Sequence, residues 1–254
     1  MKTRASIFCC VVAALLMTSC AIMPTTTVLR PISGQIATID GRDVTKDIQN
    51  DIQVVASYEG PFFDYYLFDI EVKNKTSQPW TLYPADFYGQ SVRIQKDGTK
   101  SNYFTHLDAI DPRQRMGEVE LSMKRAKRRR TVNTIVSVGL MVGSVALATS
   151  GRNHSQRDYW QRNAQLNATS QLIWTKQFID NERYNKMMYR LTNEKGLLQT
   201  DALAETTIQP GQSARGLLLI KADPKANSIN LLYPVSDAAN ITFEFEQQAV
   251  KPRR

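Results

Sequence analysis

Cysteine is scarce in this 254-residue sequence, and its distribution limits the chemistry that the protein can perform. The three cysteines, Cys9, Cys10 and Cys20, all fall within the first twenty residues. No thiolate further along the chain can therefore bind zinc, form a disulfide or act as a nucleophile. A chain without later cysteines also suits an oxidising compartment, where stray thiols would mispair.

Histidine is nearly absent as well, and no recognisable catalytic motif is present. The two histidines, His106 and His154, lie far apart in the sequence, without triad or metal spacing around them. The sequence contains no GxSxG, no GxxxxGK[ST], no HExxH and no GxGxxG after an expected strand. Carboxylate pairs such as Asp108 and Asp111 are more typical of surface charge than of an acid and a base. We therefore predict no catalytic residue, no metal site and no cofactor, and expect a protein that is not an enzyme.

The N-terminus has the layout of an export signal. Lys2 and Arg4 precede an apolar stretch from Ile7 to Met17, which is too short to span a bilayer but has the length of a signal-peptide core. The next residues complete the sequence Met-Thr-Ser-Cys at 17–20. This segment resembles the lipobox of bacterial lipoproteins, with methionine in place of the usual leucine. The resemblance covers only the first twenty residues and implies cleavage before Cys20 and attachment of lipid to it.

The same resemblance implies a location. Acyl chains on Cys20 imply stable membrane anchoring, and Ala21, in place of an aspartate, implies sorting to the outer membrane as in similar Gram-negative lipoproteins. We expect a lipid-anchored protein of the cell envelope, facing either the periplasm or the outside. Removal of Lys2 and Arg4 lowers the formal charge from +8 to +6.

The body of the chain has a β pattern on both sides of a central helical region. Apolar and polar residues alternate in Tyr66–Lys73 and in Ile241–Glu246, which is typical of strands with one buried face. About seven strands with this spacing favour an immunoglobulin-like antiparallel β-sandwich, although a β-barrel fits the same pattern. The other expected strands lie at 51–58, 80–88, 91–96, 216–221 and 229–233, and the segment before them contains one further short strand at 35–39.

A helical pattern interrupts the two β regions. From Leu172 to Leu191, apolar residues recur three to six positions apart among charged ones, which predicts an amphipathic helix. The fold is therefore expected to be mainly β with an α insertion, of the α+β class, with the sandwich interrupted by a long helical hairpin. The expected regions are a signal peptide at 1–19, a lipidated cysteine and tether at 20–45, half of the sandwich at 46–110, the helical insertion at 111–204, the second half at 205–247 and a basic tail at 248–254.

Two neighbouring segments of the insertion are candidate contact sites. Residues 131–151 carry no charge before Arg152, and Gly139 and Gly143 form a GxxxG pair that would let another helix approach closely. A basic run precedes this segment. Anionic lipid, lipopolysaccharide phosphate or an acidic protein surface fits the run better than nucleic acid, which an exported lipoprotein seldom meets, and a solvated helix face is the alternative. The cations expected to contact the membrane or an anionic partner are Lys124, Arg125, Lys127, Arg128, Arg129 and Arg130.

Three interpretations of residues 131–151 stay open. The segment is an arm packed on the amphipathic arm from Tyr159 to Leu198, a membrane helix, or an oligomerisation helix that pairs with copies of itself. We expect a non-enzymatic binding or assembly role, in which the insertion or the sandwich face contacts an envelope protein or another copy of the chain. The lipid on Cys20 attaches the protein to the membrane. The alternative function is a membrane-active or pore-associated subunit in which 131–151 enters or oligomerises at a bilayer.

Overall fold

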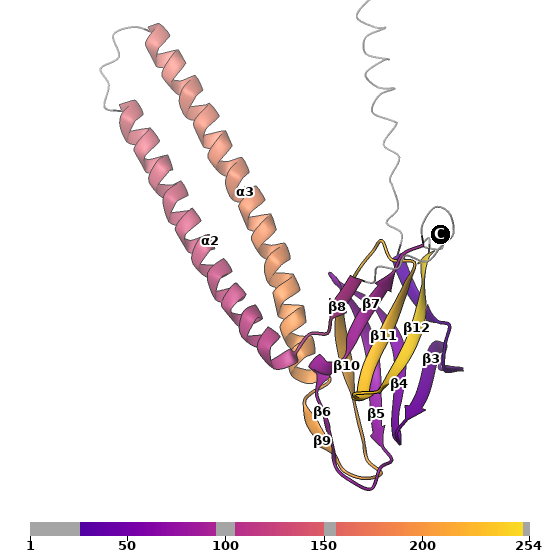
Figure 1. Cartoon of the computed structure of the whole chain (residues 1–254). Coiled ribbons are helices and arrows are strands. Elements are labelled where there is room, and N and C mark those ends of the chain that lie inside the picture. The colour runs from indigo at the N-terminus through magenta and orange to yellow at the C-terminus, as the bar shows by residue number, and fades with distance from the viewer. Residues whose placement is uncertain (1–25, 95–104, 150–155, 251–254) are drawn as a thin grey trace, which may run out of the picture.

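Antiparallel sheets and two long helices make up the described part of the protein. The computed structural model describes residues 26–94, 105–149 and 156–250. Figure 1 shows the strands gathered into one body, from which the two helices project as an arm. The fold is therefore mainly β with two helices, of the α+β class that the sequence predicts.

The first large sheet has five strands in the order β1-β12-β11-β7-β8. Alternation in β12 places Ile241, Phe243 and Phe245 on the buried face, where none is more than 1% exposed. The start of β1 lies against the end of β12, with Thr26 opposite Val250. The strands are β1 (Thr26–Pro31), β7 (Tyr88–Val92), β8 (Thr105–Asp108), β11 (Ser228–Ser236) and β12 (Ala239–Val250).

The second large sheet has five strands in the order β10-β5-β4-β3-β2. The expected alternation in β5 is confirmed, because Tyr66, Phe68, Ile70 and Val72 are all buried. A third sheet pairs only two short strands, β6 with β9, and a 3-10 turn at Pro84–Asp86 follows β6. The bounds are β2 (Gln35–Ile39), β3 (Arg42–Gln49), β4 (Ile52–Phe62), β5 (Tyr65–Asn74), β6 (Trp80–Leu82), β9 (Thr206–Ile208) and β10 (Ser213–Lys221).

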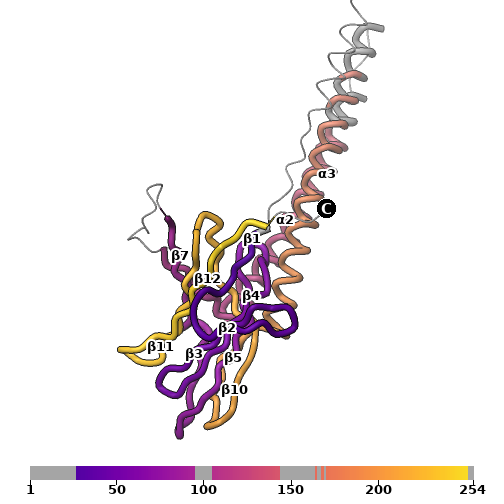
Figure 2. Tube along the Cα trace, turned by 90° about the vertical axis from the view of Figure 1, so that its right-hand side faces the viewer, coloured from indigo at the N-terminus to yellow at the C-terminus, as the bar shows by residue number. Residues whose placement is uncertain are grey.

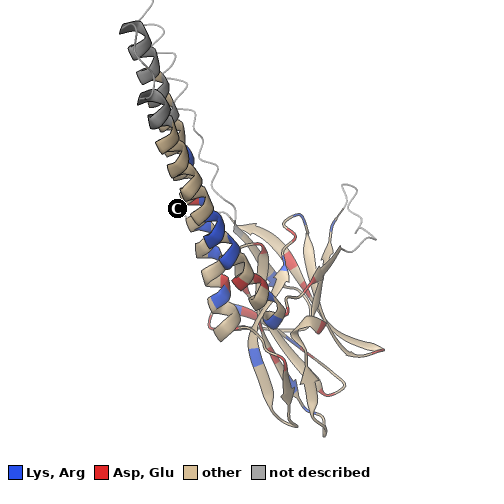
Figure 3. Cartoon of the chain, turned by 90° about the vertical axis from the view of Figure 1, so that its left-hand side faces the viewer, with Lys and Arg blue, Asp and Glu red and all other residues tan. Residues whose placement is uncertain are grey.

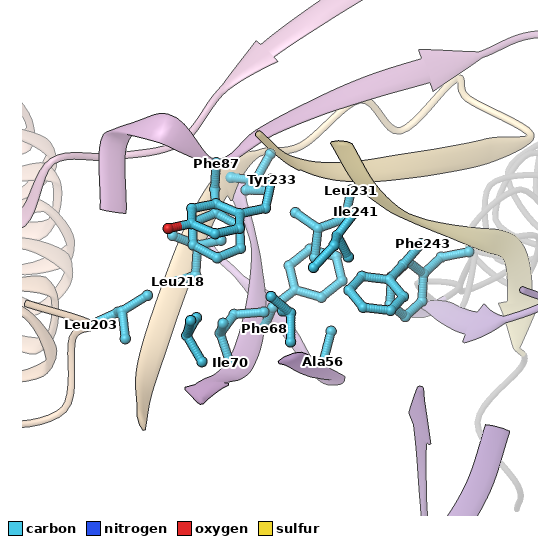
Figure 4. Packing of buried hydrophobic residues seen from close by; sticks show 14 of the residues in the cluster. Ala56, Phe68, Ile70, Phe87, Leu203, Leu218, Leu231, Tyr233, Ile241 and Phe243 are labelled. Atoms are coloured by element: carbon cyan, nitrogen blue, oxygen red, sulfur yellow. The ribbon is translucent and has the colours of Figure 1, made fainter. Parts of the chain in front are cut away.

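The two large sheets pack face to face around one apolar core (Figure 4). Phe68 of β5 meets Phe245 of β12 with ring centroids 5.1 Å apart, and Phe87 stacks on Tyr233 at 4.3 Å. Burial of each such ring stabilises the fold by roughly 2 to 3 kcal/mol. The Trp80 indole N–H donates to the Tyr233 hydroxyl at 2.9 Å, which satisfies a polar group inside this core.

The arm consists of α2 (Pro112–Thr149) and α3 (Gln156–Thr200), both within the expected insertion. Its two ends join the body beside each other on β10. The Ile110 N–H donates to Leu219 O and the Leu203 N–H donates to Leu217 O, each at 2.9 Å. Gly216, directly before Leu217, is required there because a Cβ would lie 2.6 Å from the backbone of Leu203.

The N-terminal region contains more strand than the sequence pattern indicates. The expected tether at 20–45 overlaps β1, β2 and the start of β3. The short strand expected at 35–39 is β2, which is exposed along its whole length. β1 is an edge strand with mixed burial, so it does not produce the alternation that marks a half-buried strand. The expected signal peptide at 1–19, Cys20 and residues 251–254 of the expected basic tail lie outside the described residues.

Candidate functional site

A second, smaller core fixes the base of the arm to the β body. Val119 of α2 and Leu191 and Leu198 of α3 pack with Tyr65 of β5 and Leu219 of β10. All five side chains are buried. Large apolar side chains from both helices thus contact the edge of the second sheet, which holds the start of the arm in a fixed position.

A buried ion pair lies beside this small core. Arg115 Nε donates to Glu194 Oε1 at 2.7 Å, and Arg115 Nη1 donates to Glu118 Oε2 at 2.8 Å. The Glu194 side chain is only 1% exposed, and its hydrogen bond is the main reason that the pKa of Arg115 is raised. The Arg115 guanidinium also lies 5.9 Å from the centre of the Tyr65 ring. These contacts join both helices and β5 at one point.

Further ion pairs surround the base. Arg190 Nη2 donates to Asp64 Oδ2 at 2.6 Å, and its guanidinium lies over the ring of Phe63. Lys195 Nζ donates to Glu120 Oε1 at 2.8 Å. One of these pairs reaches the turn before β5 and the other joins the two helices. The base of the arm is therefore held by polar contacts on several sides as well as by apolar packing.

The basic run predicted from the sequence lies on α2 above this base, and all six cations are exposed. Figure 3 looks at the α2 side of the arm and shows basic residues gathered part-way along it, below a mainly uncharged stretch. Arg130 is turned toward α3, because its guanidinium lies 4.5 Å from the centre of the Tyr184 ring. Asn133 Nδ2 reaches Asp180 Oδ2 at 3.5 Å just above.

The side of α2 that faces away from α3 changes character along its length. Ala126 and Ser137 are each 6% exposed and face α3. A helix turns about 100° per residue, so residues on the opposite side can be identified from their spacing. We call them the outward row: its lower part is basic and its upper part is apolar, with one glycine. The outward row consists of Lys124, Arg128, Ile135, Gly139 and Val142.

Large apolar side chains are exposed on both helices in the outer half of the arm. On α2 they are between 49% and 65% exposed, and on α3 three of them exceed 60%. An exposed patch of this kind is more informative than a buried apolar residue, because soluble monomers seldom carry one without a partner. The α2 residues are Val132, Ile135, Val136, Val138, Leu140 and Val142, and the three on α3 are Leu172, Trp174 and Phe178.

Among the described residues, the GxxxG pair makes no close packing contact. A Cβ added at Gly139 or at Gly143 would meet no atom within 4 Å. Of the three interpretations of residues 131–151, the first is seen in part. α2 pairs with α3 through contacts such as that of Asn133 with Asp180, but the two glycines are not packed against α3. Residues 150 and 151 lie outside the described residues. In the ranges that the structure describes, no helix is both long enough and apolar enough to cross a membrane.

A groove of about 500 Å³ lies between α2 and α3 at the level of Arg130. Arg129, Arg130 and Asn133 form one wall, and Trp174 and Phe178 contribute to the other. The groove thus has cations on its α2 side, and aromatic rings together with Asp180 and Arg183 on its α3 side. The sequence patterns did not predict it, because the α3 residues that face α2 depend on the pairing register between the two helices.

The β body has fewer features of a binding site than the arm. A shallow groove of about 390 Å³ on the outer face of the second sheet is lined by paired charges, with Arg42 bound to Glu59 at 2.7 Å and Arg215 to Asp69 at 2.5 Å. His106 is exposed and lies 3.1 Å from Asp108. Among the described residues, no three histidine, cysteine, aspartate or glutamate side chains gather where they could hold a metal ion.

Comparison with known proteins yields no relative for this chain. No protein-family model, no curated protein and no solved structure matches it.

Proposed function

We propose that this protein is a lipid-anchored cell-envelope protein with a non-enzymatic binding or assembly role, and that the α2–α3 arm makes the contact. The observation that carries the proposal is the exposure of large apolar side chains on the outer half of both helices. Exposure of side chains such as Ile135, Trp174 and Phe178 to water is unfavourable. A partner that covers them removes this apolar surface from water and so lowers the free energy. The anchor is the lipid that we expect on Cys20 of an outer-membrane lipoprotein.

The arm suits this role better than the exposed sheet faces do. Its base is fixed by the Arg115–Glu194 pair and by buried apolar side chains, so the outer half is presented at a defined position. The outer face of the second sheet instead carries charges that already have partners, such as Arg215 with Asp69. Exposed ion pairs of that kind contribute little to binding another molecule.

We also propose that the two packed sheets form an immunoglobulin-like sandwich. Two features support this assignment. Both sheets are antiparallel, and the chain passes from one sheet to the other between β5 and β7 and again between β10 and β11. Such crossings between two packed sheets are typical of Greek-key sandwiches. The strands β2 and β3 would then extend the second sheet beyond the usual number.

A second candidate function is a membrane-active or pore-associated subunit in which residues 131–151 enter a bilayer or oligomerise there. One observation favours it: α2 contains no charged residue from Thr131 to its end at Thr149. The two candidates share the arm as the active element. They differ in whether the outer half of α2 meets protein or lipid.

The test is a variant with a shortened arm, in which a short glycine-serine turn replaces residues 124–189. The deletion retains Arg115, Val119, Leu191 and Glu194, and with them the contacts that hold the base to the sheets. The full-length arm should either self-associate or bind vesicles, whereas the shortened arm should do neither. Light scattering and vesicle sedimentation measure both properties, and circular dichroism verifies that the β body is folded.

A matched variant, Cys20→Ala, tests the anchor separately. It should be held to the membrane less firmly than the parent chain in fractionated cells, while its arm keeps the properties measured above. If the shortened arm behaves like the full one in mass and in vesicle binding, the arm is not the contact element and the proposal is wrong. If Cys20→Ala stays attached as firmly as the parent chain, the lipid anchor is wrong.

A further inference from the structure

The start of the described chain lies at the end of the β body toward which the arm projects (Figures 1 and 2). Tyr65 packs against the arm, and its neighbour Tyr66 places its hydroxyl 2.7 Å from Gln247 Oε1. Gln247 is paired with Leu29 of β1, and the Tyr58 hydroxyl donates to Thr27 O at 3.3 Å. β1 and β8, the strand that leads into the arm, form opposite edges of the first sheet, so the start of the described chain and the base of the arm lie on opposite flanks of the β body.

The chain before β1 is short in comparison with the arm. Only residues 21–25 separate Cys20 from Thr26, and such a segment spans at most about 20 Å when fully extended. α2 has 38 residues, which corresponds to a helix about 57 Å long. Figures 1 and 2 show the arm projecting away from the β body on the side where β1 begins and β12 ends. The membrane into which the lipid on Cys20 inserts therefore lies within reach of the arm.

The basic run lies part-way along the arm (Figure 3). Lys124 and Arg130 follow Pro112 by 12 and 18 residues, so they lie about 18 and 27 Å along α2 from its start. Above the run, α2 is uncharged, and Trp174 and Phe178 of α3 are exposed close to Ser137, with which they line the same groove. Tryptophan and phenylalanine are typical of helices that lie at a bilayer surface.

We propose that the arm is a second attachment to the membrane that holds Cys20. The exposed cations of the run bind anionic lipid headgroups, and the apolar side chains above them enter the interfacial layer of the bilayer. This inference rests on the proposed lipid anchor and names the partner of the arm. It explains why basic and apolar residues follow each other along the outward row.

Charge favours lipid over a second copy as the occupant of this surface. Copies anchored in one membrane would stand with their arms parallel. Packing of two outward rows would then bring Lys124 and Arg128 of one copy against the same residues of the other. Like charges at close range repel each other and destabilise such an interface. An anionic headgroup layer attracts them, by about 1 kcal/mol per basic residue near the surface.

The experiment uses residues 21–254, which retain every described residue, lack the lipid and contain no cysteine. Binding is measured to phosphatidylcholine vesicles with and without phosphatidylglycerol. The test variant is Lys124→Gln with Arg125→Gln and Arg128→Gln. The control, Lys75→Gln with Lys221→Gln and Lys225→Gln, removes the same charge from exposed positions on the β body. The test variant should bind about 100-fold more weakly, at roughly fivefold per basic residue, and the control should bind like the parent.

A second measurement reports which side of the arm meets lipid. A single cysteine introduced by Ile135→Cys or by Thr175→Cys carries a polarity-sensitive dye. Ile135 belongs to the outward row of α2, whereas Thr175 is exposed on α3, on the side away from α2 by its helical spacing from Tyr184. The dye at position 135 should report an apolar environment when phosphatidylglycerol vesicles are added. The dye at position 175 should change less.

Each outcome has a defined meaning. The inference is overturned if the parent ignores phosphatidylglycerol, if both charge variants bind like the parent, or if both weaken equally. It is also overturned if the dye at 135 responds only to protein concentration, which would indicate packing of copies. If vesicle binding fails but the shortened arm still alters the mass in solution, the proposed contact role stands and only lipid as the partner is wrong.

Discussion

Arg115 and Glu194 join the two helices of the arm through a hydrogen bond of 2.7 Å at the point where both meet the sheets. The pair is asymmetric, because the Glu194 side chain is 1% exposed and that of Arg115 is 25% exposed. Within the described part of the protein, Glu194 Oε2 has no hydrogen-bond partner. Arg115 is therefore the principal group that compensates a buried carboxylate.

Removal of Arg115 should destabilise the protein. Arg115→Met leaves the Glu194 carboxylate buried without a cation, which costs about 3 kcal/mol of unfolding free energy. Arg113→Met is the control, because Arg113 pairs with Glu205 on the surface, with side chains 75% and 39% exposed, and such pairs contribute less than about 1 kcal/mol. Urea unfolding monitored by circular dichroism measures both. Equal losses in the two variants would show that the Glu194 site is not specially dependent on its cation.

Replacement of two glycines by alanine should change the stability of the protein in opposite directions. Gly216→Ala forces a Cβ to within 2.6 Å of the Leu203 backbone, so the strand or the end of the arm must shift and the protein loses stability, by about 2 kcal/mol. Gly117→Ala in α2 meets nothing within 4 Å and should gain up to about 1 kcal/mol through helix propensity. Thermal unfolding compares the two. A stable Gly216→Ala variant would contradict the close approach of Leu203 to β10.

The arm should be less stable at its tip than at its base. Near the base, Val119 and Leu191 are buried, whereas Val138 and Leu172 in the outer half are more than half exposed. Local stability follows the number of buried apolar contacts, so backbone amides of the outer half open more often. Hydrogen exchange measured by mass spectrometry should show faster exchange above Arg130 than below Lys124. Uniform protection along both helices would indicate that something covers the outer half.

High pH should weaken the packing between the two sheets. Burial raises the pKa of Tyr66 and of Tyr233 to about 12, above the value of about 10 in an unfolded chain. Their contribution to stability is fully present below pH 10 and is lost as the pH rises from about 10 toward about 12, because the unfolded state loses its protons first. At about pH 11 the loss is roughly 1 kcal/mol per tyrosine. Urea unfolding at about pH 9 and 11 measures it, and equal stability at both would contradict the burial of these hydroxyls.

Sequence patterns identified the strands in which buried residues alternate regularly with more exposed ones. Phe68 and Ile70 in β5 and Phe243 in β12 alternate with polar neighbours because one face of each strand packs on the opposite sheet. The later helix was predicted from an apolar spacing, but that spacing does not mark a buried face, because Leu172 and Phe178 are each 72% exposed. The short strand expected at 35–39 is β2. The edge strand β1 was not predicted, because its burial is mixed and its place is set by pairing with β12.

The candidate site was predicted only in part. The basic run and the uncharged stretch are properties of consecutive residues and can be read along the chain. The Arg115–Glu194 pair joins positions 79 apart, and the groove between Arg130 and Tyr184 depends on the same pairing of α2 with α3. Contacts of this kind are fixed by the register of two helices, which no local pattern records. The lipid on Cys20 stays a prediction.

The two ends of the arm enter the β body beside each other on β10, where Ile110 binds Leu219 and Leu203 binds Leu217. The length of the arm is therefore independent of the fold that carries it. Seven residues added to each helix would lengthen the arm by about 10 Å and leave both junctions unchanged. The arm can act as an adjustable spacer, in which the number of helical turns sets how far the β body reaches from whatever its tip contacts.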